Sequence, residues 1–431
     1  MCRRWRCIVF ASPRRLGLKL YCTPERSVNS KTLEIWPELP IVIHVDGLQS
    51  QVNATNVIAA LRHHNRVCKI YYSDRQHKDS PLLKELAAID EPFPALTSLD
   101  LFAYGFNVPV LPDSFLGGSA PRLRSLVLFG IPYPSIRTLL SSTTNLVRLS
   151  LWEIPHSGYI APETIVPSLS TLARLESLTL GFRHPRSRAS RHPPPLTRVV
   201  FPNLTFLEFR GDCEYLEDTL SQIETPVLNQ CSFRLFNQLV FDTPLLGYFI
   251  RRMETFKASH ALAARVTCFD SSIWINIELS EREEMVNDLR QILLEISCKP
   301  LDRQVSALAQ VLNSFLPSLS TLESLQIEVS HYDLQGEIEV IQWREFLHPF
   351  TSVNSVTLVG RNSVRLVLLA LQELAGDGET EVLPALQNLF IRTYSWQLFG
   401  PVKEAIEQFI ATRQLYGHPV TVHYHYQDIK K

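Results

Sequence analysis

The sequence predicts an α/β solenoid with a parallel strand face and short helices on the other side. Leucine triplets with the spacing LxxLxL recur along the chain, for example Leu123, Leu126 and Leu128. The last two leucines of a triplet are two residues apart, which is the spacing of a strand with one buried face. Between triplets, residues such as Ile136–Leu140 have helical spacing. One such strand–helix unit cannot bury both apolar faces alone, so we expect the units to stack.

The period of the triplets identifies the kind of solenoid. Explicit triplets begin 23–29 residues apart at Leu96, Leu123, Leu146, Leu175, Leu204 and Leu228. Degraded or clear triplets then follow 25–36 residues apart at Met253, Leu289, Leu322, Val353 and Leu386. These spacings bracket the 20–29-residue period of leucine-rich repeats. The Asn or Cys expected after each triplet is replaced by Tyr104, Ile131, Ile154, Arg183 or Asp212, so we expect irregular curvature.

Further elements are predicted before and after the explicit triplets. In the N-terminal part we expect strands over 39–45 and 67–72 and helices over 2–10, 56–63 and 81–89. Later helices are expected over 302–315, 362–375 and 402–415, and strand-like runs at 266–269 and 273–277 predict a hairpin insertion. The predicted organisation is a first segment over 1–20, a linker over 21–38, and a solenoid over 39–431 with insertions near 182–198 and 264–278.

Composition excludes several classes of function. The formal net charge is −1, from 42 basic and 43 acidic residues, so the whole molecule has no drive toward nucleic acid or anionic membranes. No run approaches the roughly 20 apolar residues of a membrane span, so no membrane partner is expected. The eight cysteines are scattered and contain no CxxC pair, which is typical of buried free thiols in a reducing compartment. We therefore expect a cytoplasmic or nuclear protein.

No motif predicts catalysis, a cofactor or a metal site. The chain lacks a GxSxG elbow, a GxxxxGK[ST] phosphate-binding loop, a GxGxxG turn and an HExxH helix. His423 and His425 have a spacing that can hold a metal, but no third ligand is in reach in the sequence. We expect a non-enzymatic protein without catalytic residues, cofactor or metal.

The strand face is the predicted binding surface. If the triplet leucines point inward, the residues that alternate with them point outward. Aromatic and arginine side chains, which dominate protein-binding hot spots, occupy many of these positions. The predicted target-binding residues are Phe102, Phe129, Trp152, Phe206, Arg210, Arg234, Phe390 and Arg392. Charge reversal at Arg210 and Arg234 is expected to weaken target binding without changing stability.

A basic, proline-rich loop over 183–198 has two interpretations. Its arginines can pair with phosphate on a modified target or on nucleic acid. The loop can equally be a solvated insertion without a binding role.

Segments at both ends of the chain resemble a known family. The residues Cys2-Arg-Arg-Trp-Arg6, followed by Ile8-Val9, resemble the last helix of an F-box. Further similarity to basidiomycete-fungal F-box proteins with leucine-rich repeats lies at 12–18, 33–40, 343–351, 381–387, 400–403 and 411–419.

The resemblance implies a function. Proteins of this family dock a Skp1-type adaptor through the F-box and present a target protein to a cullin-type ubiquitin ligase through the repeats. It therefore implies a substrate-recognition subunit of an SCF-type E3 ubiquitin ligase, with 1–20 as the C-terminal remnant of an F-box and Cys2 and Trp5 facing the adaptor. The earlier helices of an F-box have no counterpart after Met1. The alternative is a repeat scaffold without a ligase role.

Overall fold

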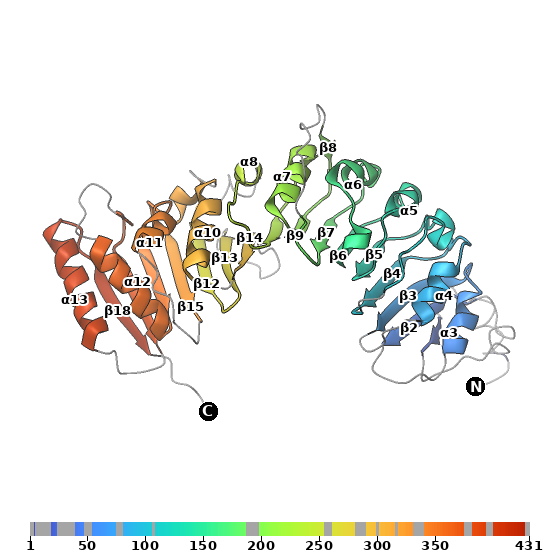
Figure 1. Cartoon of the computed structure of the whole chain (residues 1–431), viewed down its shortest axis with the longest axis horizontal. Coiled ribbons are helices and arrows are strands. Elements are labelled where there is room, and N and C mark those ends of the chain that lie inside the picture. The colour runs from blue at the N-terminus through green and yellow to red at the C-terminus, as the bar shows by residue number, and fades with distance from the viewer. Residues whose placement is uncertain are drawn as a thin grey trace. The chain divides into compact units, whose positions relative to one another are not determined.

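The computed structural model describes residue 4 and residues 19–23, 39–46, 54–74, 81–105, 108–186, 198–253, 261–280, 290–298, 301–314, 318–330, 340–374, 382–393 and 400–426. The chain divides into two compact units. The first comprises 1–185, 196–205 and 222–226, and the second comprises 186–195, 206–221 and 227–431. Strands and helices alternate along the chain in both units (Figure 1), which confirms the predicted α/β class.

Parallel strands joined by short helices build the first unit. Its sheet has the order β1-β2-β3-β4-β5-β6-β7, and neighbouring strands run parallel. The strands are β1 (Leu20–Cys22), β2 (Ile41–Asp46), β3 (Val67–Asp74), β4 (Ser98–Ala103), β5 (Ser125–Phe129), β6 (Arg148–Ile154) and β7 (Ser177–Phe182). The helices are α3 (Ala54–Leu61), α4 (Pro81–Ala88), α5 (Ile136–Ser142) and α6 (Pro162–Leu169), with 3-10 turns η1 (Phe115–Gly118) and η2 (His156–Gly158). A separate parallel ribbon pairs β8 (Val199–Val200) with β10 (Ile223–Glu224).

Strands and helices also alternate in the second unit, which contains an antiparallel insertion. Its sheet has the order β9-β11-β14-β13-β12-β15-β16-β17-β18. The strands are β9 (Phe206–Gly211), β11 (Gln230–Leu235), β12 (Ala261–Cys268), β13 (Ser272–Ser280), β14 (Arg290–Ser297), β15 (Ser324–Val329), β16 (Ser355–Val359), β17 (Asn388–Thr393) and β18 (Thr421–Tyr426). The helices are α7 (Cys213–Gln222), α8 (Pro244–Arg252), α10 (Leu301–Asn313), α11 (Val340–Leu347), α12 (Arg361–Leu374) and α13 (Gly400–Leu415), with the 3-10 turn η3 (Ser318–Thr321).

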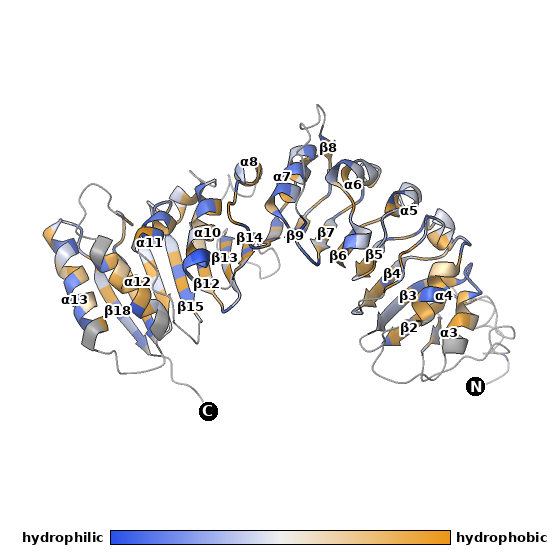
Figure 2. Ribbon diagram, in the orientation of Figure 1, coloured by the Kyte–Doolittle hydropathy of each residue, from blue (hydrophilic) through white to orange (hydrophobic). Residues whose placement is uncertain are grey.

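The leucine triplets form the core between strands and helices. Leu126 of β5 and Leu149 of β6 are paired in register, and both side chains are fully buried. Leu128 and Leu151 form the next buried pair, and Leu139 of α5 is buried as well. Figure 2 shows apolar and polar residues interspersed along the strands, as expected for one buried face. Burying one leucine side chain stabilises the fold by about 2 kcal/mol, so repetition of these pairs accounts for the stacking.

The predicted hairpin insertion near 264–278 is confirmed, and it forms part of the sheet. Strand β13 pairs antiparallel with both β12 and β14. The outer two strands of this group run parallel to their other neighbours, β14 beside β11 and β12 beside β15. Because β13 reverses the chain, β14 rather than β12 lies beside β11. Strand order therefore departs from chain order in this region.

The sheet begins before residue 39, where the solenoid is predicted to start. Leu20 pairs with Ile41 and Cys22 pairs with Ile43, so residues 21 and 22 belong to β1 and not to the linker predicted over 21–38. Leu20 and Cys22 are buried, whereas Tyr21 between them is 59% exposed.

Two repeats carry a buried isoleucine at the position where leucine-rich repeats are expected to have asparagine. Ile131 and Ile154 at that position are buried and contribute apolar contacts instead of hydrogen bonds. Hydrogen bonds from asparagine side chains link neighbouring repeats instead, and these asparagines lie in the turn before a strand. Asn145 Nδ2 donates to the Pro121 carbonyl oxygen over 3.0 Å, and Asn203 Nδ2 donates to the Ala173 carbonyl oxygen over 2.8 Å.

The described cysteines are free thiols, and most of them are buried, as the sequence predicts. Cys213, Cys231, Cys268 and Cys298 lie in the second unit and are at most 3% exposed. Burial raises the pKa of Cys268 to about 12 and also raises the pKa of Cys231. Cys68 of β3 is half-buried.

We predict that a maleimide reagent applied to the folded protein modifies Cys68 well before Cys231 or Cys268. Burial excludes the reagent and keeps the two thiols protonated, so they are poor nucleophiles. Peptide mass mapping after timed labelling, with and without guanidinium chloride, measures this order. Labelling of Cys231 in the folded protein as fast as in the unfolded protein would contradict the structure.

Candidate binding surface on the open face of the sheet

Each unit has a sheet face that lies opposite its described helices, and we call this face the open face. Strand alternation determines which residues lie on it. In β4, for example, Leu99, Leu101 and Ala103 are buried against the helix side, whereas Asp100 and Phe102 alternate with them and are half-buried. The residues predicted to face a target all occupy open-face positions: Phe102, Phe129, Trp152, Phe206, Arg210, Arg234 and Phe390 are half-buried, and Arg392 is exposed. Their role in binding stays a prediction.

The open face of the first unit carries a row of aromatic side chains, which we call the aromatic row: His44, Tyr71, Phe102, Phe129 and Trp152. Phe102, Phe129 and Trp152 occupy the same register position on β4, β5 and β6. The ring centroids of Phe102 and Phe129 are 6.1 Å apart. Side chains on adjacent parallel strands therefore form one continuous apolar surface.

Two members of the aromatic row are absent from the residues predicted from the sequence. The ring of Tyr71 on β3 lies 5.6 Å from that of Phe102, and His44 on β2 stacks on Tyr71 at 4.6 Å. Strands β2 and β3 contain no leucine triplet, so the triplet pattern does not mark their outward positions. The apolar residues Ile70 and Tyr72 on either side of Tyr71, both buried, are the signal that places it on the open face.

A glycine and a strand irregularity hold Trp152 in place. A Cβ atom on Gly181 would overlap the indole Cε3 atom, so the indole packs directly on the β7 backbone. Beyond Leu151 the register shifts, and Glu153 adopts a positive φ of 54°. The Glu153 carboxylate forms a salt bridge with Arg183 Nε over 3.5 Å, and both side chains are mostly buried. The first arginine of the predicted basic loop is thus a structural partner and not part of a solvated insertion.

Asp100 is an acidic side chain within this aromatic surface. Burial raises its pKa above the ordinary aspartate value. A hydrogen bond that Ser98 Oγ donates to Asp100 Oδ2 over 3.0 Å, together with Arg148 and Lys69 nearby, lowers the pKa and offsets part of the rise.

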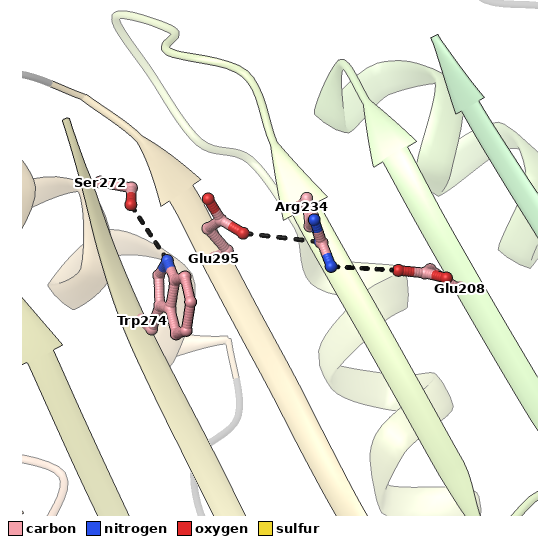
Figure 3. A network of polar contacts seen from close by, with 5 residues as sticks. All are labelled: Glu208, Arg234, Ser272, Trp274 and Glu295. Atoms are coloured by element: carbon pink, nitrogen blue, oxygen red, sulfur yellow. Dashed lines mark hydrogen bonds and ion pairs between the residues drawn. The ribbon is translucent and has the colours of Figure 1, made fainter. Parts of the chain in front are cut away.

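The open face of the second unit carries an ion-pair network instead (Figure 3). Arg234 of β11 lies between two glutamates on the neighbouring strands. Its Nη2 atom is 3.3 Å from Glu208 Oε1 on β9, and its Nε atom is 3.5 Å from Glu295 Oε2 on β14. On β13, the indole N–H of Trp274 donates to Ser272 Oγ over 3.0 Å. Arg234 is therefore already engaged within the protein.

The other predicted residues of the second unit have different surroundings. The Arg210 guanidinium lies 5.5 Å from the centroid of the Phe236 ring. Phe390 of β17 stacks on His423 at 4.7 Å and on His425 at 5.8 Å, so both imidazoles of β18 pack on an aromatic ring. Phe206 begins β9 and pairs in register with Gln230.

Some predicted features lie outside the described residues. These are the adaptor-facing residues Cys2 and Trp5 and most of the basic loop, 187–197. Of the loop's first residues, Arg186 donates its backbone N–H to Asp212 Oδ2 over 2.6 Å. Within the described part of the chain, no group of three or more His, Cys, Asp or Glu residues could hold a metal ion. Among the helices described, none is long and apolar enough to cross a membrane.

Comparison with known proteins assigns no family. No protein-family model and no curated protein matches the chain. Among solved structures, the leucine-rich repeat-containing protein LegL7 from Legionella pneumophila aligns with 79% of this chain and 97% of its own, at 14% identity and a TM-score of 0.32. A likeness this low carries no argument. The leucine-rich-repeat-like character of the chain stands on its own triplets and strand pairing.

We predict that Arg234→Glu lowers the free energy of unfolding by about 1–2 kcal/mol, since it breaks two ion pairs and places three carboxylates side by side. Because Arg234 is paired with Glu208 and Glu295, this prediction replaces the expectation that charge reversal at Arg234 leaves stability unchanged. Urea unfolding followed by circular dichroism measures the change. Arg392→Glu makes the same charge change at an exposed open-face position and is expected to cost less than about 0.5 kcal/mol. Equal losses in the two variants would contradict a stabilising network.

Proposed function

We propose that this protein is a protein-interaction scaffold that binds a target protein through the open face of its sheet. The observation that carries the proposal is the aromatic row of the first unit. Its five side chains follow one another across β2 to β6, with Phe102, Phe129 and Trp152 at one register position. Large aromatic side chains on a rigid sheet supply contact area at a low cost in conformational entropy, which is why they dominate binding hot spots.

The surroundings of the row support a binding role over a purely structural one. The leucine core on the other side of the strands already buries the helices, so the fold does not need aromatic residues on the open face. Tyr104, which contacts Phe129 with ring centroids 4.8 Å apart, is 45% exposed. In the second unit, by contrast, Arg234 is occupied by two carboxylates. The first unit is therefore the stronger candidate for the main contact.

The proposal assigns no bond chemistry to the chain. A scaffold acts by holding its target close to a second protein, which raises the effective concentration of one for the other. A reducing compartment, the cytoplasm or the nucleus, suits its free thiols.

A finer proposal follows from the resemblance of both chain ends to F-box proteins with leucine-rich repeats. In it, the chain is the substrate-recognition subunit of an SCF-type E3 ubiquitin ligase, and Cys2 and Trp5 contribute to contact with a Skp1-type adaptor. The support is the similarity of residues 2–9 to the last helix of an F-box. A repeat scaffold that has no ligase partner is the alternative.

For the open face, we predict that Phe102→Ala combined with Phe129→Ala removes target binding, because loss of two hot-spot aromatics costs about 2 kcal/mol or more each. Quantitative affinity purification from cells of the source organism compares this double variant with the wild type. Ile341→Ala, on the exposed side of α11, is the control and should retain the same proteins. Circular dichroism verifies the fold of each variant. If the double variant captures the same proteins at wild-type levels, binding through this face is refuted.

For the ligase proposal, co-expression with a Skp1-type adaptor is the direct test. We expect a stable complex when the chain is expressed with whatever sequence the gene encodes ahead of Met1, and loss of that complex on Trp5→Ala. Size-exclusion chromatography with light scattering detects it. Failure of the extended chain to bind the adaptor would reject the ligase role and leave the scaffold.

A further inference from the structure

Basic residues gather along one edge of the first unit's sheet. Because its strands are parallel, the beginnings of all strands lie at the same edge. Exposed arginines lie at the start of β6 and up to three residues before the starts of β5 and β7. On β3, an exposed lysine occupies the register position that matches these strand starts. We call them the cationic edge: Lys69, Arg122, Arg124, Arg148 and Arg174. Two acidic residues accompany them: Asp100 on β4, whose carboxylate interacts with Arg148 and Lys69, and Glu176 just before β7.

These cations are available to a ligand. All five are exposed, and none forms a salt bridge with another residue that the structure describes. Arg234 in the second unit, by contrast, is held between Glu208 and Glu295. Lys69 and Arg148 share one nearby carboxylate, that of Asp100, so the edge keeps an excess of positive charge. An anionic ligand is therefore the occupant that best complements this edge.

Two members of the cationic edge, Lys69 and Arg148, share the open face with the aromatic row. Arg148 and Trp152 lie on β6 four residues apart and on the same face, which corresponds to about 13 Å at about 3.3 Å per residue. An extended polypeptide covers that distance with about four residues. A ligand that contacts both features therefore needs negative charges about four residues away from large apolar side chains.

Resting on the proposed function, we infer that the first unit's open face recognises an acidic protein segment that also carries aromatic or leucine anchors. The acidic side chains contact the cationic edge, and the anchors pack on Phe102, Phe129 and Trp152. Single-stranded nucleic acid is the competing occupant, since its bases stack on aromatic rings and its phosphates contact cations. The protein segment is favoured because a polynucleotide carries a phosphate on every residue, so a strand whose bases stack on the aromatic rings would bring phosphates against the Asp100 carboxylate among those rings. A peptide can place its acidic side chains at the cationic edge alone.

A displayed-peptide selection tests this inference. The full chain is used to select binders from a phage library of random peptides of about 16 residues, and enriched peptides are synthesised with a fluorescent label. We expect Asp and Glu to be enriched together with Phe, Trp or Leu about four residues away. Fluorescence anisotropy should show affinity that falls as sodium chloride is raised, because screening weakens exposed charge pairs.

Matched variants locate the binding. Lys69→Glu combined with Arg148→Glu should weaken peptide binding by about tenfold or more. Arg137→Glu, exposed on α5, is the charge control and should stay within about twofold. Thermal melting of each variant verifies that the fold is retained.

The outcomes separate this inference from the proposed function. The inference would be overturned by selected peptides whose binding requires Phe102 and Phe129 but which are not acidic, or whose affinity is unchanged by the Lys69 and Arg148 reversals. The scaffold proposal would still stand. An absence of peptides that depend on Phe102 and Phe129 would overturn both. A labelled oligo-dT that binds more tightly than every selected peptide, and that loses binding in both double variants, would replace the acidic segment with nucleic acid.

Discussion

Burial of the leucine triplets between neighbouring repeats is the constraint on which the rest of this structure depends. Leu126 and Leu149 are fully buried only because β5 and β6 lie side by side in register. The same register places the residues between the leucines opposite one another on the open face, at the spacing of adjacent strands, about 4.8 Å. A row of side chains on that face is therefore a consequence of packing on the other face.

The two units use this arrangement differently. In the first, the open-face positions carry aromatic rings whose apolar surfaces are only half-buried, with cations at the beginning of the strands. In the second, Arg234 is neutralised by Glu208 and Glu295, so charge is satisfied inside the protein. A partly exposed aromatic surface favours association with a partner, whereas a network of ion pairs within the protein mainly holds its strands together.

Alternation within a strand is sufficient, from the order of residues alone, to place Phe102, Phe129 and Trp152 on the open face. The triplet pattern misses Tyr71 and His44, because their strands lack the triplet that marks the others, and only the apolar neighbours Ile70 and Tyr72 indicate the position of Tyr71. The engagement of Arg234 lies beyond sequence reasoning for a different reason. Its partner Glu295 comes from β14, which reaches β11 only because β13 reverses the chain.

Periodicity along the chain by itself determined that this protein is a stack of strand–helix units with one buried and one outward sheet face, since spacings of two and about 3.6 residues are local properties. Tertiary structure alone decided which strands are neighbours and which outward side chains are already paired. Both depend on contacts between residues far apart in the sequence, such as Arg234 with Glu295 and Tyr71 with Phe102. Nothing in the local spacing of the chain encodes those distances.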